Sequence, residues 1–292
     1  RKIVVFTNNN SAYDAAIDLS VAGSDVTIID TRSDIDDELI RSGLEAGVTL
    51  HQGKAIARAN GRKSVRSVDV IEFDCTQLQP AKIKFNLTCD ALLVSGGWTP
   101  TLHLISQRGP KPVYDENLAM FVASVLPDGF HLAGAAALSF GLQSCVSSGE
   151  RAGYAAAKEC GFSLPQIGET ILPELPNDEI DINTVALWEV PDILGLKSMM
   201  KFVDFQNDVK SEDISLAHRE GYDSVELLKR YTTLGMATDQ GKTANLNALA
   251  ILAHRHKTHI NDVGTTMFRP PYRPITMGAL VGQQKNLHFQ PT

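Results

Sequence analysis

Cysteine is scarce in this sequence of 292 residues, and its four cysteines lie far apart. They are Cys75, Cys89, Cys145 and Cys160. A disulfide framework or a zinc site is usually read from closely spaced cysteine pairs, and none is present here. The spacing therefore favours reduced thiols in a cytoplasmic protein.

Long apolar runs and an excess of positive charge are also missing. No run reaches the roughly 18 apolar residues that suggest a membrane-spanning helix. The net charge of −7 argues against nucleic acid and anionic membranes as partners. Residue 1 enters an expected strand directly, without the basic region and apolar stretch of a signal peptide. We therefore expect a piece of a longer protein.

What is present in the first half is an alternating α/β pattern. Strands are predicted at Lys2–Phe6, Asp25–Asp30, Val48–His51 and Ala91–Ser95, and helices at Ser11–Ala22 and Asp34–Ala46. Strand, helix and strand in this order require a parallel sheet with right-handed crossovers. Between residues 55 and 87 the pattern changes to alternating strands around Asn60-Gly61, which indicates an antiparallel insert. The predicted class is a Rossmann-like sheet of the two-lobed flavin-reductase type.

The glycine fingerprint of a dinucleotide site is absent from this sheet. Its three glycine positions hold Thr7, Asn9 and Ala12. A side chain at the second position fills the space that a pyrophosphate needs. Asp30 ends the second strand, where a ribose-binding acid belongs, but a terminal aspartate is common in such units. We therefore predict a retained sheet rather than a dinucleotide pocket.

A second candidate for cofactor contact surrounds Ala133-Gly134-Ala135, which precedes an expected helix from Leu142 to Lys158. The N-terminus of that helix offers N–H groups to an anion. The predicted cofactor-binding residues are Gly134, Ala135, Ala136, Phe140, Gly141, Leu142, Gly96 and Gly97. The alternative for both glycine segments is a small-residue turn with a structural role. We predict no catalytic and no metal-binding residue.

The sequence changes character after residue 172. Its predicted division is a dinucleotide-binding-like domain at 1–172, a linker at 173–192, a helical module at 193–263 and the start of another domain at 264–292. The module has three expected helices. The first is capped by Ser211, and the second is opened by Asp223 or Ser224 and carries Val225, Leu228 and Tyr231 on its core face. The third runs from Thr243 to His256.

Three sequence patterns in the module resemble ligand-binding motifs, but each has a simpler explanation. Gly241-Lys242-Thr243 has the wrong glycine spacing for a phosphate-binding loop. The histidine-rich stretch from His254 to His259 is more simply explained by cations near the end of a helix. Asp204, Asp208 and Asp239 supply too few oxygens for a hard cation.

The module resembles the small [2Fe–2S] module of bacterioferritin-associated ferredoxins. Aligned on Gln240-Gly241, the four ligand positions hold Asp204, Gln206, Asp239 and Ala244. Iron and sulfide require thiolate donors, so we predict a scaffold without its cluster. We expect Asp204, Gln206 and Asp239 to bind backbone N–H groups of the facing loop instead.

Longer segments resemble the α subunit of heterotetrameric sarcosine oxidase. These are Lys201-Phe-Val-Asp-Phe-Gln-Asn-Asp-Val209, Lys229-Arg-Tyr-Thr-Thr-Leu-Gly-Met-Ala-Thr-Asp-Gln-Gly-Lys-Thr243, Gly264-Thr-Thr-Met-Phe-Arg-Pro-Pro-Tyr272 and Leu93-Val-Ser-Gly-Gly-Trp-Thr-Pro100. The resemblance implies NAD on this subunit, FAD and FMN on or shared with a partner, and tetrahydrofolate in a following domain. It implies β, γ and δ subunits as partners, and oxidation of sarcosine to glycine, hydrogen peroxide and 5,10-methylene-tetrahydrofolate.

The resemblance assigns this chain a scaffold role and a contact with NAD. Two alternatives stay open. One is the α subunit of a related opine or amino-acid dehydrogenase, although such subunits normally keep the four cluster cysteines. The other is an assembly module without catalytic function.

Overall fold

The computed structural model describes residues 1–74, 82–163, 183–193 and 200–282. The chain divides into two compact units. The first unit comprises Arg1–Pro100, Val113–Ala123 and His131–Lys201, and the second comprises Thr101–Pro112, Ser124–Phe130 and Phe202–Thr292. Residues 173–182 of the predicted linker, Cys75 and the last ten residues lie outside the described residues. In the described part of the chain, no helix is long and apolar enough to cross a membrane.

A four-stranded parallel sheet organises the first unit, with strand order β3-β2-β1-β7. Its strands are β1 (Lys2–Thr7), β2 (Asp25–Asp30), β3 (Thr49–His51) and β7 (Ala91–Ser95), joined by helices α1 (Ser11–Val21) and α2 (Asp37–Glu45). Each predicted strand and helix of this sheet is confirmed within a few residues. Asp36 is the N-cap residue of α2, and its carboxylate accepts from the backbone N–H groups of Glu38 and Leu39.

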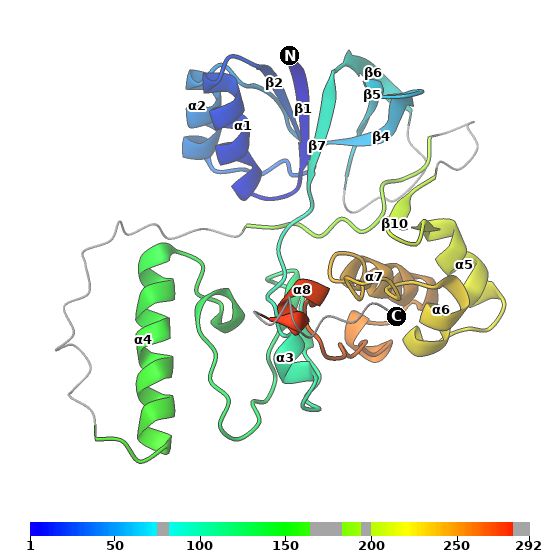
Figure 1. Cartoon of the computed structure of the whole chain (residues 1–292). Coiled ribbons are helices and arrows are strands. Elements are labelled where there is room, and N and C mark those ends of the chain that lie inside the picture. The colour runs from blue at the N-terminus through cyan, green and yellow to red at the C-terminus, as the bar shows by residue number, and fades with distance from the viewer. Residues whose placement is uncertain (75–81, 164–182, 194–199, 283–292) are drawn as a thin grey trace. The chain divides into compact units, whose positions relative to one another are not determined.

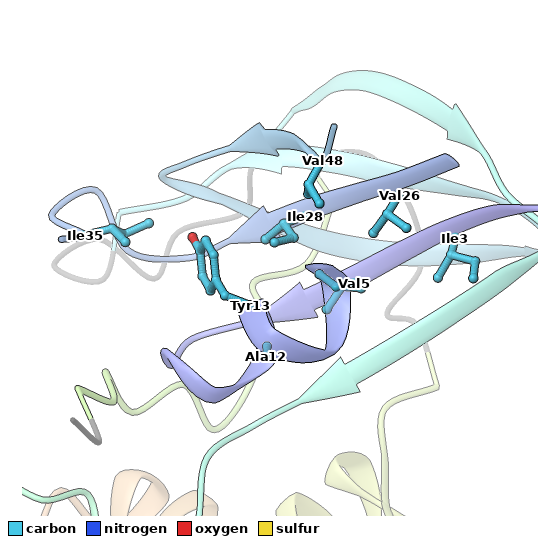
Figure 2. Close-up of a cluster of buried hydrophobic side chains, with 9 residues drawn as sticks. Ile3, Val5, Ala12, Tyr13, Val26, Ile28, Ile35 and Val48 are labelled. Atoms are coloured by element: carbon cyan, nitrogen blue, oxygen red, sulfur yellow. The ribbon is translucent and has the colours of Figure 1, made fainter. Parts of the chain in front are cut away.

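Both faces of β1 and β2 are buried, because successive side chains on a strand point to opposite faces. Ile3 and Val5 join a cluster with Tyr13 of α1 and Ile28 of β2 (Figure 2). Val4 packs in a second cluster on the other face, with side chains of the antiparallel insert. The continuous apolar run of β1 therefore fits the central position that it occupies in the sheet.

The antiparallel insert forms a three-stranded sheet of β4 (Lys54–Gly61), β5 (Val65–Glu72) and β6 (Ile83–Thr88), in the order β4-β5-β6. It lies across the parallel sheet from α1 and α2 (Figure 1). Asn60 and Gly61 were expected to form the hairpin turn. Instead they still pair, with Ser67 and Val65, and the turn follows at residues 62–64. The Cβ of any residue at 61 would meet the Ser64 carbonyl oxygen, so glycine is required there.

The first unit is completed by a hairpin of β8 (Val113–Asp115) and β9 (Met120–Val122), a 3₁₀ turn η1 (Gly134–Ala137) and the helix α4 (Leu142–Glu159). Tyr114 and Met120 of the hairpin are buried. Helix α4 starts at the predicted residue and ends one residue later than predicted. Only Ser148 of this helix is buried among the described residues.

Short helices build the second unit. They are α3 (His103–Ser106), α5 (Ser211–Arg219), α6 (Val225–Thr232), α7 (Asn245–His256), η2 (Ile260–Asp262) and α8 (Met277–Val281), with a two-stranded ladder of β10 (Phe202–Asp204) and β11 (Val209–Lys210). Helices α5, α6 and α7 pack into one module (Figure 1). Its core contains Ile214, Leu228, Leu249 and Leu252, each at most 1% exposed.

Two details of the module differ from expectation. Ser211 is the first residue of α5 rather than its cap, because the N-cap residue is Lys210, whose backbone N–H donates to Asp213 at 2.9 Å. Tyr231 was placed on the core face of α6, but it is 39% exposed and stacks on Tyr222. Its hydroxyl donates to Glu220 at 2.6 Å, and a surface position keeps this polar group solvated. Ser224 caps α6 as predicted.

Candidate functional site

The carboxyl ends of β1, β2 and β7 meet at one edge of the parallel sheet. Open α/β sheets bind ligands at this edge, where the chain order changes direction, and here that point lies between β1 and β7. The residues that follow the strands are polar and buried: Thr7, Asn8, Asn9, Asp30 and Arg32. Their hydrogen bonds decide whether the edge is open to a ligand.

The acid at the end of β2 is committed to a buried ion pair. Asp30 is fully buried, and its carboxylate lies 2.8 Å from Nη2 and 3.1 Å from Nε of Arg32. Tyr13 donates its hydroxyl to the same carboxylate at 3.0 Å. Burial, and then the charge of Asp30, raise the pKa of Tyr13 far above its ordinary value. Asp30 therefore has its oxygens engaged by protein donors rather than directed to a ribose.

A segment from later in the chain covers this edge of the sheet. In this closing segment (residues 183–185), Thr184 pairs with Asn9 and the backbone N–H of Val185 donates to the Asn8 carbonyl oxygen at 3.0 Å. The Asn8 side chain donates back to the Val185 carbonyl oxygen at 2.7 Å. Arg32 donates through Nη1 to the Asn183 carbonyl oxygen, also at 2.7 Å. The polar groups that a dinucleotide would approach are thus bonded to the chain itself.

Gly96 and Gly97 belong to this covered edge. The Gly96 carbonyl oxygen accepts from the Asn8 side chain at 3.4 Å. Gly97 has φ +101, and an added Cβ would lie 2.9 Å from Cγ2 of Thr184. A positive φ and a close neighbour both favour glycine. The structure therefore gives Gly97 a packing role beside the closing segment, which is the structural alternative weighed for it above.

The other six predicted cofactor-binding residues surround the start of α4. Gly134 has φ +60, and its backbone N–H donates to Oγ of Ser148 at 2.8 Å. Ser148 in turn donates to the Cys145 carbonyl oxygen, which fixes the turn against the helix. The remaining positions are the exposed Ala135 and Leu142, the half-buried Ala136 and Phe140, and the buried Gly141.

The N-terminus of α4 is suited to a negatively charged group. Gly141 is its N-cap residue and contributes no side-chain acceptor, and the first turn contains no acidic residue. The helix has 18 residues, so the backbone dipoles at its start are well aligned. The predicted residues therefore form two sets, one at the covered sheet edge and one at this helix terminus.

Asp204 is the central polar group of the helical module. It is 2% exposed, and it accepts hydrogen bonds from the backbone N–H groups of Gly235 at 2.8 Å, Gln206 at 2.9 Å and Asn207 at 3.2 Å. Burial alone would raise the pKa of Asp204, but the three backbone donors outweigh it and lower the pKa. The expected link between Asp204 and the facing loop is confirmed.

The other cluster-ligand positions behave differently. Gln206 is exposed, and Asp239 accepts from Gly241 within its own loop at 3.2 Å, so the expected links from these two side chains to the facing loop are wrong. Ala244 is buried beside Asn245, a residue that the sequence analysis overlooked. An added Cβ at Gly235 or Gly241 would collide with the Asn245 side chain. This donor set, with no sulfur, does not fit an iron–sulfur cluster.

Gln240 and Lys242 hold the extended segment that follows the module. Gln240 accepts from the Arg269 backbone N–H at 2.8 Å and donates to its carbonyl oxygen at 2.9 Å. Lys242 donates to the Tyr272 carbonyl oxygen at 2.6 Å, and its ammonium lies 4.2 Å from the centre of the Tyr272 ring. Phe268 of the same segment stacks edge-on against His103, at 3.6 Å between ring centres. Lys242, which lies in the sequence that resembles a phosphate-binding loop, therefore binds Tyr272 and has a structural role.

Comparison with known proteins finds similarity first for part of the second unit and then for the whole chain. Residues 198–284 match the family model of the sarcosine oxidase A3 domain. Over its full length the chain is 38% identical to sarcosine oxidase subunit alpha of Rhizobium meliloti (strain 1021), and 99% of it is 32% identical to that of Corynebacterium sp. (strain P-1). These alignments confirm the predicted resemblance. The chain spans 28% of the first relative and 30% of the second.

A solved structure supports the fold. L-proline dehydrogenase from P. horikoshii aligns with 96% of this chain and 50% of its own, with a TM-score of 0.59 and 18% sequence identity. At this identity the likeness concerns the fold alone. It agrees with the predicted α/β architecture, whereas the ferredoxin-like character of the helical module stays a prediction.

Proposed function

We propose that this chain, which is similar over its whole length to the α subunit of sarcosine oxidase, serves as a scaffold within such an enzyme complex. The observation that carries this proposal is the 38% identity spanning the complete chain, joined by the match of residues 198–284 to the A3 domain. The chain spans 28% of that relative, so the enzymatic activity is proposed for the assembled enzyme to which this chain contributes.

The proposed activity of the assembled enzyme is oxidation of the N-methyl group of sarcosine. Oxygen accepts the electrons and becomes hydrogen peroxide, while tetrahydrofolate takes up the carbon as 5,10-methylene-tetrahydrofolate and glycine is released. FAD and FMN on or shared with a partner subunit would supply the redox chemistry. The β, γ and δ subunits are the proposed partners. No residue of this chain is assigned a catalytic role.

The proposed contribution of this chain to cofactor binding is the N-terminus of α4. An NAD molecule bound there would direct its pyrophosphate toward backbone N–H groups of the helix, which attract negative charge. Ala135 stands where the ribityl-binding aspartate of FAD sites is expected, which favours NAD over FAD. The edge of the parallel sheet is covered, because the closing segment is hydrogen-bonded to Asn8 and pairs with Asn9. This cover favours the start of α4 over the sheet edge as the place of cofactor contact.

The test is the NAD content of the assembled enzyme after substitution at this turn. Ala135→Leu places a larger side chain beside the start of α4, at an exposed position whose φ is not positive. We expect the variant to lose at least ~90% of its bound NAD, measured after heat release, because the added side chain fills the space that the pyrophosphate needs. Sarcosine oxidation should persist if the subunits still assemble.

A matched control separates cofactor loss from backbone strain. Gly134→Leu and Gly161→Leu both impose a side chain on a positive φ, at +60 and +83 respectively. The two glycines lie at opposite ends of α4, and an added Cβ at Gly161 meets nothing within 4 Å. Only the Gly134 variant should lose NAD. Full NAD content in the Ala135 and Gly134 variants, or equal loss in the Gly161 variant, would refute the placement.

A further inference from the structure

Three side chains with metal-binding atoms converge in the helical module, away from the groups discussed above. His218 lies in the last turn of α5, Asp223 in the loop before α6, and His256 at the last residue of α7. One nitrogen of each imidazole and one carboxylate oxygen all lie within 4.8 Å of one another. Within residues 1–74, 82–163, 183–193 and 200–282, no other group of three histidine, cysteine or acidic residues gathers as closely.

The separations of these atoms suit a small cation. Oδ1 of Asp223 lies 3.0 Å from Nδ1 of His218 and 3.6 Å from Nε2 of His256. In a tetrahedral zinc site with bonds of ~2.0–2.1 Å, neighbouring donor atoms are about 3.3 Å apart. The two measured separations lie on either side of that value. The backbone carbonyl oxygen of Asp223, 3.1 Å from Nε2 of His256, is a further oxygen at the same place.

The surroundings of the group also favour a positive charge. His218 and His256 stand in the last turns of α5 and α7, where unpaired carbonyl groups carry partial negative charge. The neighbouring cation Arg255 is directed elsewhere, because its Nε donates to Ser215 and its Nη1 contacts His254. The two imidazole rings lie 4.5 Å apart in an edge-to-face arrangement.

We infer that His218, Asp223 and His256 form a binding site for a divalent transition-metal ion of the zinc type. The donor set of two imidazoles and one carboxylate suits such ions, and water or the Asp223 carbonyl oxygen completes the coordination. The bound ion joins the ends of α5 and α7 to the loop before α6. It binds the ring nitrogen that faces Asp223 in each imidazole, and the proton on that nitrogen moves to the other ring nitrogen.

This site differs from the one that the histidine-rich stretch suggested. His254 and His259 are exposed and lie outside the group, whereas His256 meets a histidine and an aspartate from another part of the sequence. Sequence spacing within 254–259 alone does not reveal the site. The protein without metal keeps its own hydrogen bonds there, from His218 to the Asp223 carboxylate and from His256 to its carbonyl oxygen.

The experiment is a titration of the metal-stripped, tag-free full chain with Zn²⁺ at pH 7.5, followed by calorimetry and by the thermal unfolding midpoint. We expect one ion per chain and a rise in the unfolding midpoint with metal. Asp223→Asn and His256→Ala should each weaken binding by at least ~10-fold. Cobalt as a probe should give the visible absorption of a tetrahedral site in the parent chain and not in these variants.

Two controls make the result decisive. His254→Ala removes a neighbouring exposed histidine and should leave the zinc affinity unchanged. Asp223→Asn keeps an amide oxygen as a hydrogen-bond acceptor, so circular dichroism should show a folded chain whose loss of affinity reflects the missing charge. Absence of zinc binding by the parent chain, undiminished binding by Asp223→Asn, or equal loss in His254→Ala would overturn the assignment.

Discussion

Removing the Asp204 carboxylate should destabilise the helical module, mainly because one buried backbone N–H group loses its acceptor. In Asp204→Ala the backbone N–H of Gly235, which now donates to Oδ2 at 2.8 Å, loses its acceptor inside the protein. Gly235 is buried, so water cannot replace the carboxylate without a rearrangement of the loop. A stranded buried donor costs about 1–3 kcal/mol.

The other two backbone hydrogen bonds of Asp204 contribute less. Gln206 is exposed and Asn207 is half-buried, so their N–H groups can turn to water after the substitution. Each lost bond of this kind is worth about 0.5–1 kcal/mol. The total expected loss in the free energy of unfolding of the module is therefore about 2–5 kcal/mol. Asp204→Asn should lie between the parent and the alanine variant, since an amide accepts through only one of its two terminal atoms.

The assay must follow the second unit separately, because a chain with two units need not unfold in one step. Differential scanning calorimetry gives the unfolding midpoint, and amide hydrogen exchange reports on the Gly235 N–H itself. Asp239→Ala is the matched control. Its carboxylate accepts from Gly241 within its own half-buried loop, so we expect a loss below about 1 kcal/mol. An Asp204→Ala variant within about 0.5 kcal/mol of the parent, with Gly235 still protected, would refute the reasoning.

The pKa of Asp204 adds a dependence on pH. Backbone hydrogen bonds to the charged form hold this pKa below its value in the unfolded chain, which is about 3.9. The folded state then binds fewer protons than the unfolded state near that pH, so the stabilisation is complete above about pH 4. It is lost as the pH falls through the lower, folded-state pKa. The difference in stability between the parent and Asp204→Asn should therefore shrink with acidification, whereas a pH-independent difference would contradict the charge-based account.

Three further predictions concern the closing segment and the cofactors. Arg32→Met leaves the buried Asp30 without its cation and should cost about 3–5 kcal/mol of unfolding free energy. The double variant Arg32→Met with Asp30→Asn should recover part of this loss, because it also removes the unpaired charge. Equal losses in the single and double variants would contradict this. The isolated 292-residue chain should neither retain NAD through purification nor form peroxide from sarcosine, because the chain spans 28% of the related α subunit. NAD measured after heat release and a peroxide assay check the two expectations. The purified chain should contain no iron or acid-labile sulfide by elemental and colorimetric analysis, and stoichiometric amounts of both would refute the assignment of Asp204, Gln206, Asp239 and Ala244.

The parallel sheet was predictable because its signals are local. The apolar run of Lys2–Phe6 and the spacing of the next two strands fit only a βαβ arrangement with right-handed crossovers. The hairpin turn begins two residues later than predicted, because Asn-Gly commonly forms two-residue turns whereas this loop has three residues. Tyr231 was misplaced because helical spacing does not show that a hydroxyl pairs with Glu220 at the surface.

The polar contacts of the candidate sites were less predictable, because they join residues that are distant in sequence. Arg32 bonds to Asn183, 151 positions later, and no periodic pattern encodes that contact. The metal-binding group has the same character, since His218 and His256 meet only when α5 and α7 pack together. For the buried Asn245, the only hint in the sequence was that it follows Ala244, one of the aligned cluster-ligand positions. Its polar side chain at the start of a largely apolar helix is the kind of residue that needs a buried partner.

At both positions where a cofactor-binding motif is incomplete, the residue that is present makes hydrogen bonds within the chain. At the sheet edge, Asn9 stands at the second fingerprint position, and its side-chain amide donates to the Ser95 carbonyl oxygen at 3.2 Å. In the module, Asp204 stands at a cluster-ligand position and binds the loop at Gly235. Backbone N–H and C=O groups at such positions need partners once water is excluded, and a charged or amide side chain supplies them. Asn9→Gly and Asp204→Cys would therefore each remove an internal hydrogen-bond partner. Neither substitution alone would complete a cofactor site. Single reversions toward either signature should on this ground lower stability without restoring binding.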